Sequence, residues 1–305
     1  MPRISRRHAV LGSAALAAIG SAALAVDATT DKVAVAKKES VPRAAARGAA
    51  PIVLVHGTWH GGWVWGPVRR LLTAAGHDVY APSCTGCGDR AHLLTPEVGL
   101  DTHVQDICGL IEAEELQHVV LVGHSFAGLT ITGVADRMRD RIGHLVYLDA
   151  LVPTRERPTA VPRKPDGSYP EFWEKRRAKF IDGYKMDYFA EYPLEMLVPK
   201  EDLASQAWLR RRLTPHPSRG WSDSISFANG GYEGLPKTIV RCTAQIYSPS
   251  SREMAGPSLT TAPKTASGAP DPWNLLELPA SRDAMVTHPH ETAVALAGIA
   301  RATRS

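Results

Sequence analysis

Residues 119–138 constrain the fold more than any other part of the sequence. An apolar, β-branched run over 119–123 predicts a buried strand, and the residues after Ser125 are compatible with a helix. A strand that passes into a helix through so short a turn brings the two backbones close together, so the residues two before and two after the serine must be small. Gly123 and Ala127 meet this requirement. The turn is expected to strain the backbone of Ser125 and to lift its hydroxyl above the sheet edge.

Strand and helix signals alternate on both sides of this turn. Helical spacing or helix-compatible composition is found at about 68–75, 100–111, 126–138 and 289–301. Short apolar runs predict strands at 52–56, 79–81, 119–123, 145–148, 238–242 and 275–278. Strands that alternate with helices indicate an α/β fold, with a mostly parallel sheet covered by helices on both faces.

The alternation is interrupted once. Residues 153–236 carry many aromatic and charged side chains, which predicts an inserted helical cap. The aromatic side chains of the cap imply a hydrophobic pocket. Residues 248–272 are rich in Pro, Ser, Thr, Ala and Gly, and indicate a long loop. One domain is therefore expected over 51–305.

The N-terminus has the pattern of a targeting signal. Basic residues at 3, 6 and 7 precede an apolar run of small residues over 9–26, so residues 1–28 are expected to be a cleaved signal peptide. The pair Arg6-Arg7 resembles a twin-arginine signal, with the general secretory route as the alternative. Residues 29–50 lack apolar periodicity and indicate a tether. We expect the mature protein to be periplasmic or secreted, with no stable membrane span.

Composition excludes several function classes. The chain has 35 basic and 31 acidic residues, which is too balanced for a nucleic-acid partner. Cys84 and Cys87 form a lone C-x-x-C without the second pair that a zinc site needs, and are expected to be two free thiols or a local disulfide. No metal, nucleotide or flavin motif is evident, so no cofactor is expected. The oligomeric state is not indicated by the sequence.

Ser125 is the candidate nucleophile. It precedes the start of a helix, where backbone N–H groups favour a developing anion. A glycine-rich turn over 56–63 follows the first strand. Its Thr58 N–H, together with the Phe126 N–H, could form an oxyanion hole. The alternatives are an incidental serine in a strand–turn–helix and a glycine-rich turn packed by tryptophans.

Several motifs resemble those of a known family. Residues 56–65, 74–77, 100–103, 123–128 and 147–150 are similar to α/β-hydrolases of the plant methylesterase and hydroxynitrile lyase group and of their bacterial esterase relatives. The similarity spans about 51–153 and returns at 236–243 and 277–296. It implies the α/β-hydrolase fold and carboxylic ester cleavage. The lyases carry Thr where this chain has Gly57, and Lys where it has Asp283, so a lyase is disfavoured.

The chain departs from the family at the general base. Bacterial members carry a histidine where this sequence has Arg282. Guanidinium stays protonated and cannot accept the serine proton. His288 is the first candidate to replace it, and His290 is less free because a helix is expected there; both could equally be surface histidines. Three further histidines are expected to hold loops by hydrogen bonds instead: His56, His60 and His124.

The acid partner is also displaced. The family's Asp after the penultimate strand is missing, because Ala244 follows Cys242-Thr243. Asp149 is the best substitute, since it follows a strand at the carboxyl edge of the sheet, where catalytic groups gather in open α/β sheets. A structural carboxylate is the alternative role for Asp149. Glu253 and Asp271 rank lower because they lie in the irregular loop.

These observations favour a serine carboxylesterase that cleaves small to medium apolar esters through an acyl-enzyme at Ser125. Arg282 supports a second hypothesis, a catalytically impaired protein of the same fold that binds an apolar ligand. The two differ in whether a group on the protein can take the serine proton.

Overall fold

The computed structural model describes residues 40–43, 48–244 and 273–303. Its main sheet has six parallel strands in the order β2-β1-β3-β4-β7-β8. These strands are β1 (Ile52–Val55), β2 (Val79–Tyr80), β3 (Val119–His124), β4 (Ile142–Leu148), β7 (Lys237–Cys242) and β8 (Asn274–Leu278). All six were predicted, and the α/β fold class is confirmed.

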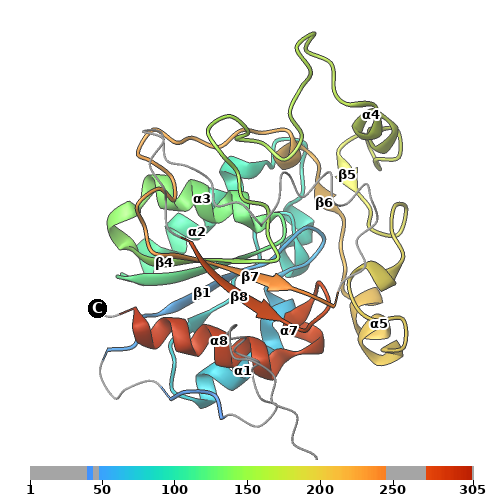
Figure 1. The fold of residues 1–305 in the computed structure, drawn as a ribbon. Coiled ribbons are helices and arrows are strands. Elements are labelled where there is room, and N and C mark those ends of the chain that lie inside the picture. Colours follow the sequence, from blue (N-terminus) through green and yellow to red (C-terminus); the bar gives the residue numbers. More distant parts are fainter. Residues whose placement is uncertain (1–39, 44–47, 245–272, 304–305) are drawn as a thin grey trace, which may run out of the picture. The chain divides into compact units, whose positions relative to one another are not determined.

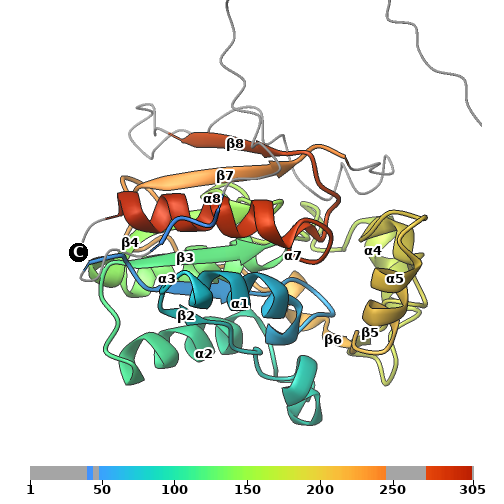
Figure 2. The same ribbon diagram turned by 90° about the horizontal axis from the view of Figure 1, so that it is seen from below.

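Helices cover both faces of the sheet (Figures 1 and 2). One face carries the contacting pair α1 (Gly66–Ala74) and α8 (Pro289–Ala302), and the other carries α2 (Leu100–Ala113) and α3 (Ala127–Arg137). The short helix α7 (Ala284–Thr287) directly precedes α8. The first strand and the last helix therefore lie close together, although most of the sequence separates them.

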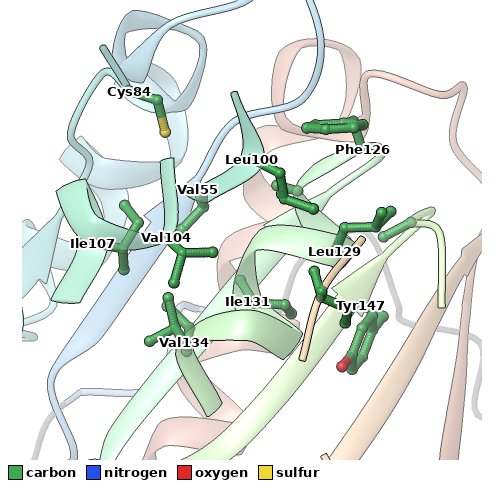
Figure 3. Close-up of a cluster of buried hydrophobic side chains, with 14 of the residues drawn as sticks. Val55, Cys84, Leu100, Val104, Ile107, Phe126, Leu129, Ile131, Val134 and Tyr147 are labelled. Carbon is green, nitrogen blue, oxygen red and sulfur yellow. The ribbon is translucent and has the colours of Figure 1, made fainter. Parts of the chain in front are cut away.

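The core is divided by the sheet, because successive side chains of a strand point to opposite faces. Val53 and Val55 of β1 join the cluster beneath α2 and α3, whereas Ile52 and Leu54 join the cluster beneath α1 and α8. Figure 3 shows the first cluster, where Val55 lies among side chains of α2 and α3. Burial on both faces explains why the central strands β1 and β3 are apolar runs.

The segment between β4 and β7 forms the inserted cap. It contains α4 (Glu171–Arg177), β5 (Lys185–Met186), α5 (Leu203–Arg210) and β6 (His216–Pro217), and it lies beyond the carboxyl ends of the strands (Figure 1). The β5 and β6 strands pair antiparallel, which was not predicted. The guanidinium of Arg176 lies 5.0 to 5.7 Å from the rings of four aromatic residues, namely Trp59, Trp173, Tyr192 and Trp221.

Several expectations fall outside the described residues. They are the signal peptide at 1–28, most of the tether and the loop at 248–272, including Glu253 and Asp271. Cys84 and Cys87 are buried free thiols, which is one of the two expected states. Within the described ranges, no helix is both long and apolar enough to cross a membrane.

Candidate active site

Ser125 lies in the turn between β3 and α3, at the carboxyl edge of the sheet. Its backbone has a φ of 57°, in the left-handed region that non-glycine residues rarely adopt. A Cβ added to Gly123 would lie 2.7 Å from the carbonyl oxygen of Ala127. Strand and helix therefore approach as closely as the sequence predicts, and a larger residue at 123 would force them apart.

Arg282 occupies the position next to the serine hydroxyl. Its Nη2 donates a hydrogen bond to Ser125 Oγ, and its Nη1 donates to Asp149 Oδ2 at 2.8 Å. Ser125 follows β3, Asp149 follows β4 and Arg282 follows β8. The carboxyl ends of these three parallel strands lie at the same edge of the sheet. The chain thus joins serine, arginine and aspartate in one hydrogen-bonded array.

The chemistry of this array differs from that of a serine–histidine pair. The guanidinium donates to Oγ and has no lone pair with which to accept the hydroxyl proton. The Asp149 side chain is 1% exposed and the Arg282 side chain 23%, so the acid lies beneath the guanidinium and balances its charge. Asp149 is therefore placed to orient Arg282, which in turn donates to Ser125 Oγ.

The two predicted oxyanion donors come from different segments: Phe126 directly follows Ser125, and Thr58 lies in the loop after β1. In the described part of the chain, the backbone N–H groups of Thr58 and Phe126 donate to no acceptor. A Cβ added to Gly57 would lie 2.8 Å from Ser125 Cβ, so the loop that carries Thr58 runs directly against the serine. Neither N–H group is therefore engaged by another described residue, and their role in an oxyanion hole stays a prediction.

The structure does not bring His288 to Ser125. Its backbone N–H bonds to Ala284 O at 2.8 Å, which continues the turn of α7. Its Nδ1 lies 2.9 Å from the hydroxyl of the neighbouring Thr287. His288 is thus held at the junction of α7 and α8, and its role as a base stays a prediction from the sequence.

The three histidines near Ser125 in sequence hold loops, as expected. His56 accepts the backbone N–H of Cys84 at Nε2, 3.0 Å away, and donates from Nδ1 to Gly57 O. His124 Nε2 lies 3.1 Å from the carbonyl oxygen of Arg282. Burial lowers the pKa of both His56 and His124 to about 3. These two histidines are accordingly neutral at neutral pH.

His60 makes a contact that the sequence analysis missed. Its Nδ1 lies 2.8 Å from Thr58 O and its Nε2 lies 3.0 Å from Asp283 Oδ2. His60 thus lies between a carbonyl oxygen and a carboxylate oxygen, and it links the loop after β1 to Asp283. Burial alone raises the pKa of Asp283, but His60, His124 and Arg282 together hold it below its ordinary value. The sequence offered one hint of this contact: Asp283 directly follows Arg282, which stands in the place of the family's histidine.

The parallel sheet, the cap and a serine in a left-handed turn after β3 define an α/β-hydrolase. The family model described as "Alpha/beta hydrolase family" matches residues 52–295, and the chain belongs to this family. The chain is 37% identical over 257 residues to a carbendazim hydrolyzing esterase of Nocardioides sp. (strain SG-4G), covering 82% of this chain and 99% of that protein. It is 31% identical over 208 residues to methylesterase 2 of Arabidopsis thaliana, covering 62% and 76%.

A solved structure agrees on the fold. An extracellular α/β-hydrolase from a Paenibacillus species superposes with a TM-score of 0.61 at 20% identity, covering 82% of this chain and 98% of that one. Within the described ranges, no group of three or more His, Cys, Asp or Glu residues has the geometry to hold a metal ion.

Proposed function

We propose that the protein is a serine carboxylesterase that cleaves small to medium apolar esters through an acyl-enzyme at Ser125. Both sequence relatives described above are esterases by name, and the chain is a carboxylic ester hydrolase in this general sense. The serine mechanism rests on one observation: Ser125 stands in a left-handed turn beside two backbone N–H groups without an acceptor, those of Thr58 and Phe126.

Aromatic side chains near the nucleophile support an apolar substrate. The Phe126 ring stacks on Trp221 at a centroid distance of 5.4 Å, and Trp221 stacks on Trp173 of the cap at 5.8 Å. His216 packs its edge against Phe126 at 5.3 Å. These rings are buried and form an apolar layer where the cap packs against the residue after Ser125, which supports a substrate with an apolar group.

The bridge from Arg282 to Ser125 favours a second candidate function. In that alternative the protein keeps the fold but has lost turnover, and it binds an apolar ligand beneath the cap. The hydrogen bond from Arg282 Nη2 to Ser125 Oγ supports this candidate, because the position of the family's base holds a group that cannot accept a proton.

Turnover of p-nitrophenyl acetate separates the two candidates. We expect the wild type to release p-nitrophenol and to gain the mass of one acetyl group on Ser125, whereas Ser125→Ala should do neither. Ser224→Ala, at an exposed position, is the matched control and should behave as the wild type. Equal rates in the wild type and Ser125→Ala would favour the ligand-binding protein.

The protein's destination is also a proposal. The residues 1–28 support export in the folded state to the periplasm or the medium. Replacing Arg6 and Arg7 together by Lys should leave the protein in the cytoplasm, which fractionation followed by immunoblotting would detect. Continued export of the Lys-Lys variant would point to the general secretory route.

A further inference from the structure

The turn after β1 holds an unusual backbone conformation at Trp59. The backbone N–H of His60 donates to Gly57 O at 3.4 Å, so residues 57–60 form a four-residue turn. The backbone of Trp59 has a φ of 66°, as in a type II turn, whose third residue is usually glycine. For a side chain as large as indole this conformation is a rare exception. Such strain persists only where the surrounding contacts impose it.

Two other left-handed residues stand at the same edge of the sheet. Ser125 has a φ of 57° and Asp149 a φ of 44°. Trp59 lies in the loop after β1, and Ser125 and Asp149 directly follow β3 and β4, which are the next two strands of the sheet. Left-handed backbone at non-glycine residues clusters at active sites, where it is part of the site's geometry. Trp59 thus shares this feature with the nucleophile and with the aspartate that orients Arg282.

The side chain of Trp59 is bound to the cap. Its Nε1 donates to the carbonyl oxygen of Met186 in β5 at 3.0 Å, and the residue is buried. The rings of Tyr188 and Tyr192 pack T-shaped against the indole, at centroid distances of 5.1 and 5.7 Å. The guanidinium of Arg176 lies 5.7 Å from the same ring. The cap therefore contacts this one indole through a hydrogen bond, two aromatic rings and a cation.

A second cap segment holds the backbone of Trp59. The backbone N–H of Thr214 donates to Trp59 O at 3.0 Å. Met186 precedes α5 in the sequence and Thr214 follows it, so two separate segments of the cap bind the same residue. The turn after β1 is thus tied to the cap through both the side chain and the backbone of Trp59.

Thr58 is the other central residue of this turn. Its carbonyl oxygen lies 2.8 Å from His60 Nδ1. The turn runs so close to the nucleophile that a Cβ added to Gly57 would lie 2.8 Å from Ser125 Cβ. Because a four-residue turn has only two central residues, the backbone angles of Trp59 and Thr58 together set the direction of their peptide groups. A change at Trp59 should therefore redirect the Thr58 N–H beside the serine.

We propose that Trp59 is a positioning residue, through which the cap holds the Thr58 N–H toward the carbonyl oxygen of an ester at Ser125. The proposal rests on the serine esterase function, because acyl transfer at Ser125 is the step that creates an oxyanion there. Oxyanion donors act on charge that develops in the transition state, and contribute little to binding of the neutral ester. Loosening Trp59 should therefore lower kcat and leave KM almost unchanged.

Trp59→Phe tests this role against the matched variant Tyr188→Phe. Trp59→Phe removes the hydrogen bond to Met186 O and keeps an aromatic ring. Tyr188→Phe removes the hydrogen bond from the neighbouring ring to Pro193 O, 2.6 Å away within the cap. Each change deletes one hydrogen bond of the cap, so both variants should lose similar stability in urea. On p-nitrophenyl acetate, kcat should fall by about tenfold to a hundredfold in Trp59→Phe alone, with KM within about twofold.

A pair of ketones gives a second readout that does not depend on turnover. Ser125 Oγ can add to the carbonyl carbon of trifluoromethyl pentyl ketone, with loss of the serine proton to solvent, and the carbonyl oxygen then becomes an oxyanion. Methyl pentyl ketone has the same chain and binds without this addition. In Trp59→Phe the Kd of the fluorinated ketone should rise by about the factor by which kcat falls, and that of methyl pentyl ketone should change little.

The outcomes distinguish this proposal from the proposed function. Unchanged kcat in Trp59→Phe, or equal losses in Trp59→Phe and Tyr188→Phe, would overturn the positioning role but keep the serine esterase, provided that Ser125→Ala is inactive. A wild type that neither turns over the ester nor adds to the fluorinated ketone would overturn both. If Trp59→Phe does not fold, Tyr192→Ala removes a half-buried ring from the indole and should show the same selective loss of kcat. Full activity of that variant would then overturn the positioning role.

Discussion

His60 Nε2 lies 3.0 Å from Asp283 Oδ2, and this contact ties the loop that carries Thr58 to the loop that carries Arg282. Both side chains are buried, with 2% and 0% exposed. One ring nitrogen of His60 contacts Thr58 O, and the other contacts the residue next to Arg282. The relative position of the two loops thus depends on a buried contact between His60 and Asp283.

Removing the charge of Asp283 should destabilise the protein strongly. Asp283→Asn removes the buried carboxylate that faces His60, and breaking a buried pair from one side typically costs about 3–5 kcal/mol. Urea unfolding monitored by tryptophan fluorescence measures this loss. Asp182→Asn removes the exposed partner of Lys185 and serves as the control, since exposed pairs contribute about 0–1 kcal/mol. An equal loss in both variants would contradict a stabilising contact between His60 and Asp283.

Truncating His288 tests the base expected from the sequence. His288 is bonded to Thr287 and not to Ser125, so His288→Ala should leave kcat on p-nitrophenyl acetate within about twofold. Steady-state rates of this variant and of His290→Ala give the comparison. A decrease of about 10²–10⁴-fold confined to His288→Ala would instead show that a loop movement brings this histidine to the serine.

Adding one methyl group at Gly57 should impair activity more than folding. The new Cβ would lie 2.8 Å from Ser125 Cβ and 3.0 Å from His124 Nδ1, so the loop that carries Gly57 and Thr58 must move away from the serine. Because a displacement of about 1 Å can cost about a hundredfold in rate, we expect kcat of Gly57→Ala to fall by about that factor. Gly109→Ala is the control, since nothing lies within 4 Å of its added Cβ. A fully active Gly57→Ala would contradict a close approach of Thr58 to Ser125.

Stability should fall as the pH decreases from about 6.5 to 3. The pKa of His56 and of His124 is lowered by burial from 6.5 to about 3, so the unfolded chain binds protons in this range that the folded protein excludes. The stability contributed by each neutral histidine is present above pH 6.5 and is lost as the pH falls, at up to about 1.4 kcal/mol per pH unit.

Unfolding midpoints in urea at pH 7 and pH 4.5 check this dependence. His124→Gln should be less stable than the wild type at pH 7 but should lose less stability between the two conditions. His92→Gln, at an exposed position, is the control and should keep the wild-type slope. An unchanged pH dependence in His124→Gln would mean that His124 is not held neutral in the folded protein.

The main-domain fold was largely predictable because its signals are local. Each strand of a parallel sheet buried on both faces must be an apolar run, and each covering helix must repeat its apolar residues at helical spacing. The six strands and the four predicted helices outside the cap therefore lie close to their predicted ranges. The turn at Ser125 was predictable for the same reason, since small residues at 123 and 127 suffice to let strand and helix touch.

The cap was predictable only in outline. Its aromatic content indicated an inserted segment, but its two-residue strands at 185–186 and 216–217 pair across about thirty residues. Such short strands leave no periodic pattern in the sequence. Their pairing is decided by the surrounding packing.

The sequence by itself determined which residues stand in the site: a serine in a tight turn, an aspartate after β4 and an arginine in place of a histidine. Only the tertiary structure decided what these residues do together. Arg282 reaches both Ser125 and Asp149 because the carboxyl ends of β3, β4 and β8 converge at one edge of the sheet. Hydrogen bonds depend on distances of a few tenths of an ångström, and residues more than 100 positions apart acquire such distances only when the whole sheet has formed.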